Sequence, residues 1–152
     1  MGAEPRLTLR PLAAADAAAY AEGAAEEAGE PAALSAARWP FDAAAEIAVW
    51  EPDPRRNAFA VEEDGRLVGV VSLQATGPGE AEAAYWVRRA DRGRGVATRA
   101  LGLLAALAAE RGLALLWLEI SPSNGPSLRV AERSGFTPGK QRDGMVIWTR
   151  AV

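Results

Sequence analysis

Apolar and polar residues alternate along several short stretches of the chain, a pattern typical of half-buried strands. Residues 6–12 alternate in this way and contain Pro11, so we expect an edge strand there. Two further runs, residues 58–63 and 66–74, are joined by Asp64-Gly65, which is a strong signal for a hairpin. The same kind of pattern predicts strands at residues 81–88, 136–141 and 145–150.

Other stretches repeat their apolar residues at helical spacing. The clearest is the segment 94–111, a predicted helix that ends at Gly112. A short helix is predicted from 126 to 134, closed by Gly135. Near the start of the chain, two alanine-rich segments at about 13–28 and 41–50 also predict helices. The run 113–120 is continuously apolar, as expected for a strand buried on both faces.

These elements follow the order β-α-α-β-β-β-α-β-α-β-β, which predicts an α/β (α+β) fold. We expect a mixed, mostly antiparallel sheet of about seven strands with about four helices. A chain of 152 residues is long enough for one core and too short for two, so residues 1–152 are predicted to form a single domain.

Composition narrows the chemistry that such a domain can perform. The chain has no cysteine and no histidine, which excludes thiolate nucleophiles, the Ser-His-Asp triad and nearly all zinc sites. Acid–base chemistry must therefore use carboxylates, hydroxyls, lysine or water, and we expect no metal. A net charge of −3 argues against nucleic acid as the main partner. No apolar stretch suggests a signal peptide or a membrane helix, so we expect a cytoplasmic protein.

The most informative segment runs from a predicted strand through a polar turn to two glycines and a helix. Gly93 and Gly95 would allow a ligand to approach the backbone, and the first N–H groups of the helix would face it. Together with the helix dipole, these groups form an anion site suited to a pyrophosphate. Considered alone, the segment could equally be a glycine-containing loop flanked by arginines.

Two motifs at the expected separation decide between these interpretations. Residues 92–97, Arg-x-x-Gly-x-Ala in pattern, resemble the coenzyme-A motif of the GNAT N-acetyltransferases. The flanking residues, and the block Asn124 to Phe136 with its Asn-x-x-Ser…Gly-Phe pattern, are similar to the branch that acetylates the N-termini of ribosomal proteins, the RimJ/RimL-like group. The resemblance covers residues 81–140, the predicted acetyl-CoA-binding core.

Membership of this family implies a reaction and a set of site residues. Acetyl-CoA would be the co-substrate, an amine (a small molecule or a protein N-terminus) the acceptor, and a homodimer would be common. Tyr85, Trp86 and Val87 would lie on a strand that splays from the next one and exposes backbone groups to pantetheine. The pyrophosphate would be held by Arg92, Gly93, Arg94, Gly95, Val96, Ala97 and Thr98. Asn124 would lie near the pantetheine, although it could also simply cap the short helix.

The predicted catalytic residues are Glu119 and Ser127. Glu119 follows an apolar run, where a carboxylate is rare unless it is paired or functional, and relatives carry a glutamate base at this place. Glu82 is the second candidate base. Many family members carry a tyrosine that protonates the thiolate, but that position here is Ala131. Ser127 or water would take over that step.

Two other classes of protein fit parts of the pattern. A strand, Gly93-x-Gly95, a helix and then Glu119 superficially resemble a dinucleotide-binding oxidoreductase, although the third glycine is replaced by Thr98. The missing tyrosine would also suit a coenzyme-A-binding module without catalysis. The sequence does not identify the amine.

Overall fold

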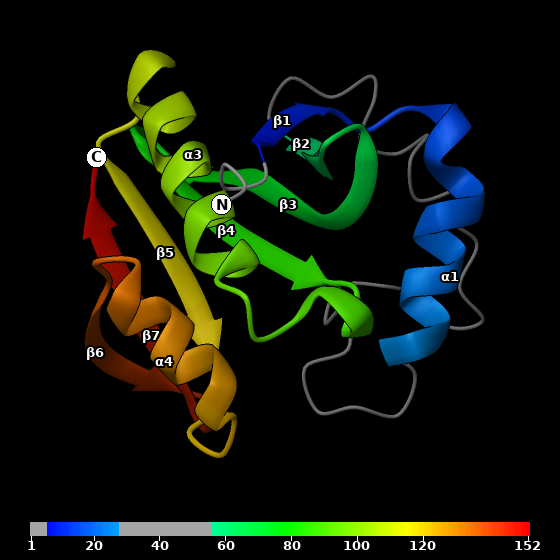
Figure 1. The fold of residues 1–152 in the computed structure, drawn as a ribbon. Helices are drawn as coiled ribbons and strands as arrows, with labels where there is room; N and C mark the ends of the chain where they lie inside the picture. Colours follow the sequence, from blue (N-terminus) through cyan, green and yellow to red (C-terminus); the bar gives the residue numbers. More distant parts are fainter. Residues whose placement is uncertain (1–5, 28–55) are drawn as a thin grey trace.

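The computed structural model describes residues 6–27 and 56–152, drawn in colour in Figure 1. Within these residues seven strands form one sheet in the order β1-β2-β3-β4-β5-β7-β6. The strands are β1 (Leu7–Pro11), β2 (Arg56–Glu63), β3 (Arg66–Gly77), β4 (Glu80–Val87), β5 (Leu115–Ile120), β6 (Thr137–Arg142) and β7 (Met145–Ala151). The helices are α1 (Ala17–Glu27), α3 (Val96–Glu110) and α4 (Gly125–Arg133), with 3-10 turns at Ala14–Asp16 and Arg89–Asp91.

Two Asp-Gly turns set the register of the hairpins. Asp64 and Gly65 both have positive φ, 50° and 84°, and they join β2 to β3 with Glu63 opposite Arg66. Asp143 and Gly144 join β6 to β7 in the same way, with φ of 51° and 78°. Such turns match the twist of antiparallel strands, which is why two residues suffice to connect them.

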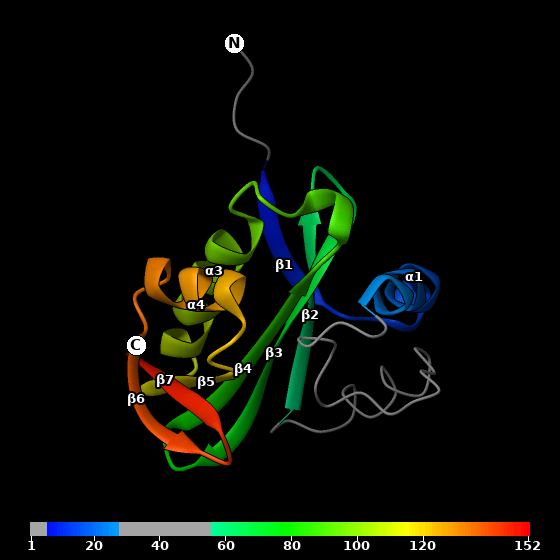
Figure 2. The ribbon, with the colours of Figure 1, turned by 90° about the horizontal axis from the view of Figure 1, so that it is seen from below.

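The helices lie on both faces of the sheet. Figure 2 shows α3 and α4 on one side and α1 on the other. The larger core fills the space between the sheet and α3, where Leu101, Leu104 and Leu116 have no exposed surface. A smaller core lies under α1, where Tyr20 packs on Trp86 with ring centroids 6.0 Å apart. No helix of the described residues is long and apolar enough to cross a membrane.

Among the described strands, β4 and β5 form the one parallel pair, and their pairing is short. It comprises Glu80 with Leu115, Ala81 with Leu116 and Glu82 with Trp117. Beyond Glu82 the two strands continue without pairing, and Figure 1 shows their arrows diverging. The predicted splay of residues 85–87 from the following strand is therefore present.

Most predicted elements are confirmed within a few residues, including the edge position of β1. The mostly antiparallel sheet overturns the oxidoreductase alternative, which requires a parallel sheet. The prediction that residues 113–120 are buried on both faces is wrong. Burial alternates along β5, with Leu116, Leu118 and Ile120 in the core and Leu115, Trp117 and Glu119 partly exposed on the other face. The helix predicted at 41–50 lies outside the described residues.

Candidate active site

A cavity of about 450 Å³ lies where β4 and β5 separate. Its walls come from the end of β4, the loop that leads into α3 with the first turn of that helix, and α4 along its length. The predicted coenzyme-binding residues that line it are Tyr85, Trp86, Val87, Arg92, Gly93, Gly95, Val96, Ala97, Thr98 and Asn124, together with Ser127. Arg94 and Glu119 are not among the lining residues. Two segments of sequence, separated by a helix and a strand, thus form one site.

The loop before α3 has the geometry of an anion site. Gly93 and Gly95 have φ of 77° and 78°, a conformation that costs residues with a Cβ and is natural for glycine. Gly95 is the N-cap of α3, and no side chain caps the helix. The bond from Arg99 N to Gly95 O, 3.0 Å, closes the first turn, so the preceding N–H groups lack partners within the helix. These N–H groups and the helix dipole suit a pyrophosphate.

Arg94 supports the loop from outside the cavity. Its guanidinium lies 2.8 Å from Asp91 Oδ1 and 3.1 Å from Glu63 Oε1. Asp91 is only 4% exposed, and Arg66 also binds its carboxylate, at 2.7 Å from Oδ1 and 3.2 Å from Oδ2. The hydrogen bond from Arg66 is the largest of the causes that lower the pKa of Asp91, and Arg94 adds to it. The role that these contacts favour for Arg94 is to hold the loop in shape.

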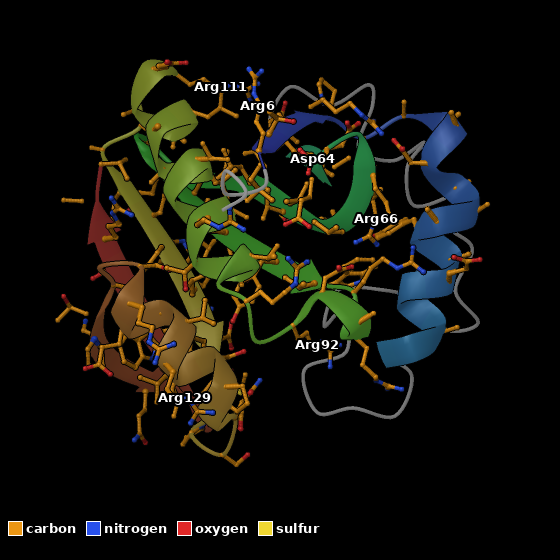
Figure 3. All side chains as sticks on the ribbon, in the orientation of Figure 1. Arg6, Asp64, Arg66, Arg92, Arg111 and Arg129 are labelled. Atoms are coloured by element: carbon orange, nitrogen blue, oxygen red, sulfur yellow. The ribbon has the colours of Figure 1, made fainter. Side chains whose placement is uncertain are left out.

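Three other arginines do line the cavity. Arg92 donates from Nε to the carbonyl of Val87 at 3.1 Å, so one backbone group expected to face pantetheine is already engaged. Arg129 and Arg133 form no ion pair with another described residue, and Figure 3 shows Arg129 on α4 and Arg92 on the loop after β4. Arg129 and Arg133 are not among the site residues predicted from the sequence. Their spacing of four residues, which places both on one face of a helix, was the available signal.

The start of α4 brings Asn124, Ser127 and Tyr85 together. The Asn124 side chain accepts a hydrogen bond from Ser127 N at 3.3 Å. It therefore caps α4, one of the two roles predicted for it from the sequence. Tyr85 Oη donates to Ser127 Oγ at 2.9 Å. Burial raises the pKa of Tyr85, and its hydrogen bond to Ser127 opposes that shift. Ala131, where many family members carry tyrosine, has no exposed surface.

The opposite face of β4 and β5 carries two carboxylates. Glu82 pairs in register with Trp117, and Glu119 follows two residues later on the same face of β5. Burial, followed by the negative charge of Glu119, raises the pKa of Glu82. Glu119 itself lies 3.3 Å from the guanidinium of Arg142, which also covers the Trp117 ring at 5.4 Å from its centroid. Glu119 is thus paired, as one of its two interpretations predicted.

Comparison with known proteins identifies the family. The model of the acetyltransferase (GNAT) domain matches residues 6–137. No curated protein is significantly similar to the chain in sequence.

Solved structures share the fold at low sequence identity. The GNAT domain of S. lividans PAT is 26% identical, with a TM-score of 0.78 over 95% of this chain and 89% of that one. RimJ of Mycobacterium smegmatis, solved with a CoA-disulfide, is 22% identical, with a TM-score of 0.81 over 95% and 81%. A putative ribosomal-protein-serine acetyltransferase from Vibrio cholerae is 20% identical, with a TM-score of 0.81 over 97% and 94%.

The chain belongs to the GNAT acetyltransferase family. It is an acetyl-CoA-dependent N-acetyltransferase. The family match and the shared fold confirm the family, the fold and the reaction class that the two sequence motifs predict.

Proposed function

We propose that the enzyme transfers the acetyl group directly to a primary amine while both substrates are bound. The observation that carries this proposal is the gap between β4 and β5. The cavity lies on one face of the gap. On the other face are two carboxylates, Glu82 in the last residue pair and Glu119 two residues beyond it on β5. Direct attack also agrees with the absence of cysteine, since no thiol can carry the acetyl group.

We propose one orientation for acetyl-CoA in the cavity. The pyrophosphate would lie on the N–H groups between Gly95 and Thr98, with Arg92, Arg129 and Arg133 around it. Pantetheine would then run along the unpaired edge of β4, past Val87, toward Asn124 and Ser127. This orientation places the thioester at the gap, where an amine can approach from the acidic face.

The amine must lose a proton before or during attack, because amines are mostly ammonium at neutral pH. We propose that the Glu82–Glu119 pair serves this step. The sequence favoured Glu119 as the base, whereas the contacts favour Glu82, because Arg142 neutralises Glu119 and burial raises the pKa of Glu82. Glu119 would then supply the second negative charge that attracts the ammonium ion.

When the C–S bond breaks, the electron pair moves to sulfur. Ser127 is the proposed hydrogen-bond donor to that sulfur, because it lines the cavity and its hydroxyl lies 2.9 Å from Tyr85 on the unpaired part of β4, where the thioester would be. A thiol has an ordinary pKa near ~8.5, so the thiolate can also take its proton from water.

The test is release of free coenzyme-A thiol from acetyl-CoA in the presence of spermidine, paromomycin or a short peptide with an N-terminal serine. The proposal predicts amine-dependent thiol release and an acetylated amine in the mass spectrum. Thiol release that no amine of these three classes accelerates would instead favour a coenzyme-A-binding module. Light scattering on the same sample tests the homodimer that the family resemblance leads us to expect.

A further inference from the structure

Two hydroxyl groups from distant parts of the sequence meet inside the coenzyme cavity. Tyr85 lies on β4, beyond the last residue paired with β5, and Ser127 lies in the first turn of α4. Their oxygens are 2.9 Å apart, and both residues line the cavity. The contact links two walls of the cavity, β4 and the start of α4.

Both partners are held in place by other contacts. Tyr85 is half-buried and packs against the larger core, so its ring has little freedom to turn away. The backbone N–H of Ser127 donates to Asn124 Oδ1 at 3.3 Å, which fixes the start of the helix and the position of the Ser127 Cβ. The Ser127 hydroxyl can still rotate, and its hydrogen bond with Tyr85 therefore sets the direction in which the O–H points.

A hydroxyl has one hydrogen to donate and two lone pairs to accept with. Tyr85 is the more acidic partner and donates its hydrogen to Ser127 Oγ. That bond occupies a lone pair of Ser127 and turns its hydrogen away from Tyr85. We propose that Tyr85 is a positioning residue that aims the Ser127 hydroxyl at the thioester sulfur, an inference that rests on the proposed function of Ser127.

The effect on the reaction is to stabilise charge on the leaving sulfur. The amine nitrogen bonds to the carbonyl carbon, the C–S bond breaks, and the electron pair stays on sulfur, which accepts the Ser127 hydrogen bond. Donation from Tyr85 makes Ser127 a stronger donor, since hydrogen bonds in a chain polarise one another. The thiolate then takes a proton from water, while the amine proton leaves through the carboxylate pair.

The experiment is a double-mutant cycle on Tyr85→Phe and Ser127→Ala. Tyr85→Phe keeps the ring and removes only the hydroxyl. The readout is thiol release from acetyl-CoA with spermidine as the acceptor. If the enzyme acetylates no tested amine, water serves as the nucleophile. We expect kcat to fall about fivefold to tenfold in Tyr85→Phe and roughly a hundredfold in Ser127→Ala, with KM for acetyl-CoA nearly unchanged.

The double variant should be no slower than Ser127→Ala alone, because Tyr85 acts through Ser127. Ser127→Thr, which keeps a hydroxyl, should recover most of the activity and remain sensitive to Tyr85→Phe. Tyr20→Phe is the matched control. It removes the hydroxyl of the chain's other tyrosine, which lies on α1 and is 6% exposed, and should leave kcat unchanged.

Each alternative result has a distinct meaning. Parental kcat in Tyr85→Phe, or losses that multiply in the double variant, would overturn the role of Tyr85 and leave that of Ser127 intact. Parental kcat in Ser127→Ala would remove both roles. Loss of acetyl-CoA binding in Tyr85→Phe would show that the tyrosine supports the cavity rather than the leaving group.

Discussion

The two faces of the β4–β5 gap are built in different ways. The coenzyme face consists of two nearly continuous segments, residues 85–98 and 124–133, and much of its chemistry comes from backbone N–H groups. The acidic face takes single side chains from three strands, namely Glu82, Trp117, Glu119 and Arg142. Substitutions should therefore affect the coenzyme face through backbone shape and the acidic face through charge.

The largest effect is expected from Gly95→Val. Valine is strongly disfavoured at a φ of 78° and would place a side chain beside the pyrophosphate. We expect the acetyl-CoA-induced rise in melting temperature to disappear. Gly102→Val is the matched control, because a Cβ at either position meets nothing within 4 Å and Gly102 lies in the regular part of α3. If both variants bind acetyl-CoA equally well, the loop is not the phosphate site.

The next largest effect is expected from Glu82→Gln, which keeps the size of the side chain but cannot accept a proton. A positioned base contributes ~10²–10⁴-fold, and kcat should fall within that range while acetyl-CoA binding is retained. Because the pKa of Glu82 is raised, the acidic limb of the parental pH–rate profile should lie above the ordinary range of glutamate. Glu119→Gln should be milder. The reverse order of the two variants would return the role of base to Glu119.

A moderate effect on stability is expected from Asp91→Asn, which weakens the support of the coenzyme loop. The lowered pKa of Asp91 means that its stabilisation is present above the ordinary value near ~3.9 and is lost as pH falls through the lower folded value. At neutral pH the variant should lose about 1–2 kcal/mol.

Its melting temperature should also depend less on pH in the acid range than that of the parent. The control is Asp143→Asn in the exposed β6–β7 turn, which should behave like the parent. An Asp91→Asn protein with parental stability at every pH would show that the Asp91 contacts do not support the loop.

The smallest effect is expected from Arg142→Ala, which removes a positive charge from the acidic face. KM for a cationic amine should fall by about two- to threefold, because the ammonium ion no longer competes with the guanidinium for Glu119. KM for acetyl-CoA should not change. Lys140→Ala removes an exposed charge from the same strand and serves as the control. A higher KM in Arg142→Ala would indicate that Arg142 binds the acceptor itself.

The contrast between the coenzyme face and the acidic face also explains how much of the site could be predicted from the sequence. The coenzyme face was predictable because the glycines before α3, the two helix starts and the asparagine that caps α4 are local signals that do not depend on the rest of the fold. The pairing of Glu119 with Arg142, and of Tyr85 with Ser127, depends on strand register and helix placement across 23 and 42 residues. Arg94 lies within the coenzyme motif, yet its side chain forms an ion pair with Glu63 of β2. That partner lies outside the motif, so the motif alone could not reveal the contact.

The most direct test of the coenzyme cavity is calorimetric titration of the full chain with acetyl-CoA and with acetyl-pantetheine. Acetyl-pantetheine has the thioester and the pantetheine arm but lacks the pyrophosphate and the nucleotide. We expect acetyl-CoA to bind with one site per chain and acetyl-pantetheine to bind at least about a hundredfold more weakly, because the loop before α3 and the arginines that line the cavity would bind the phosphates. Equal affinity for the two ligands, or no binding of acetyl-CoA, would contradict this expectation.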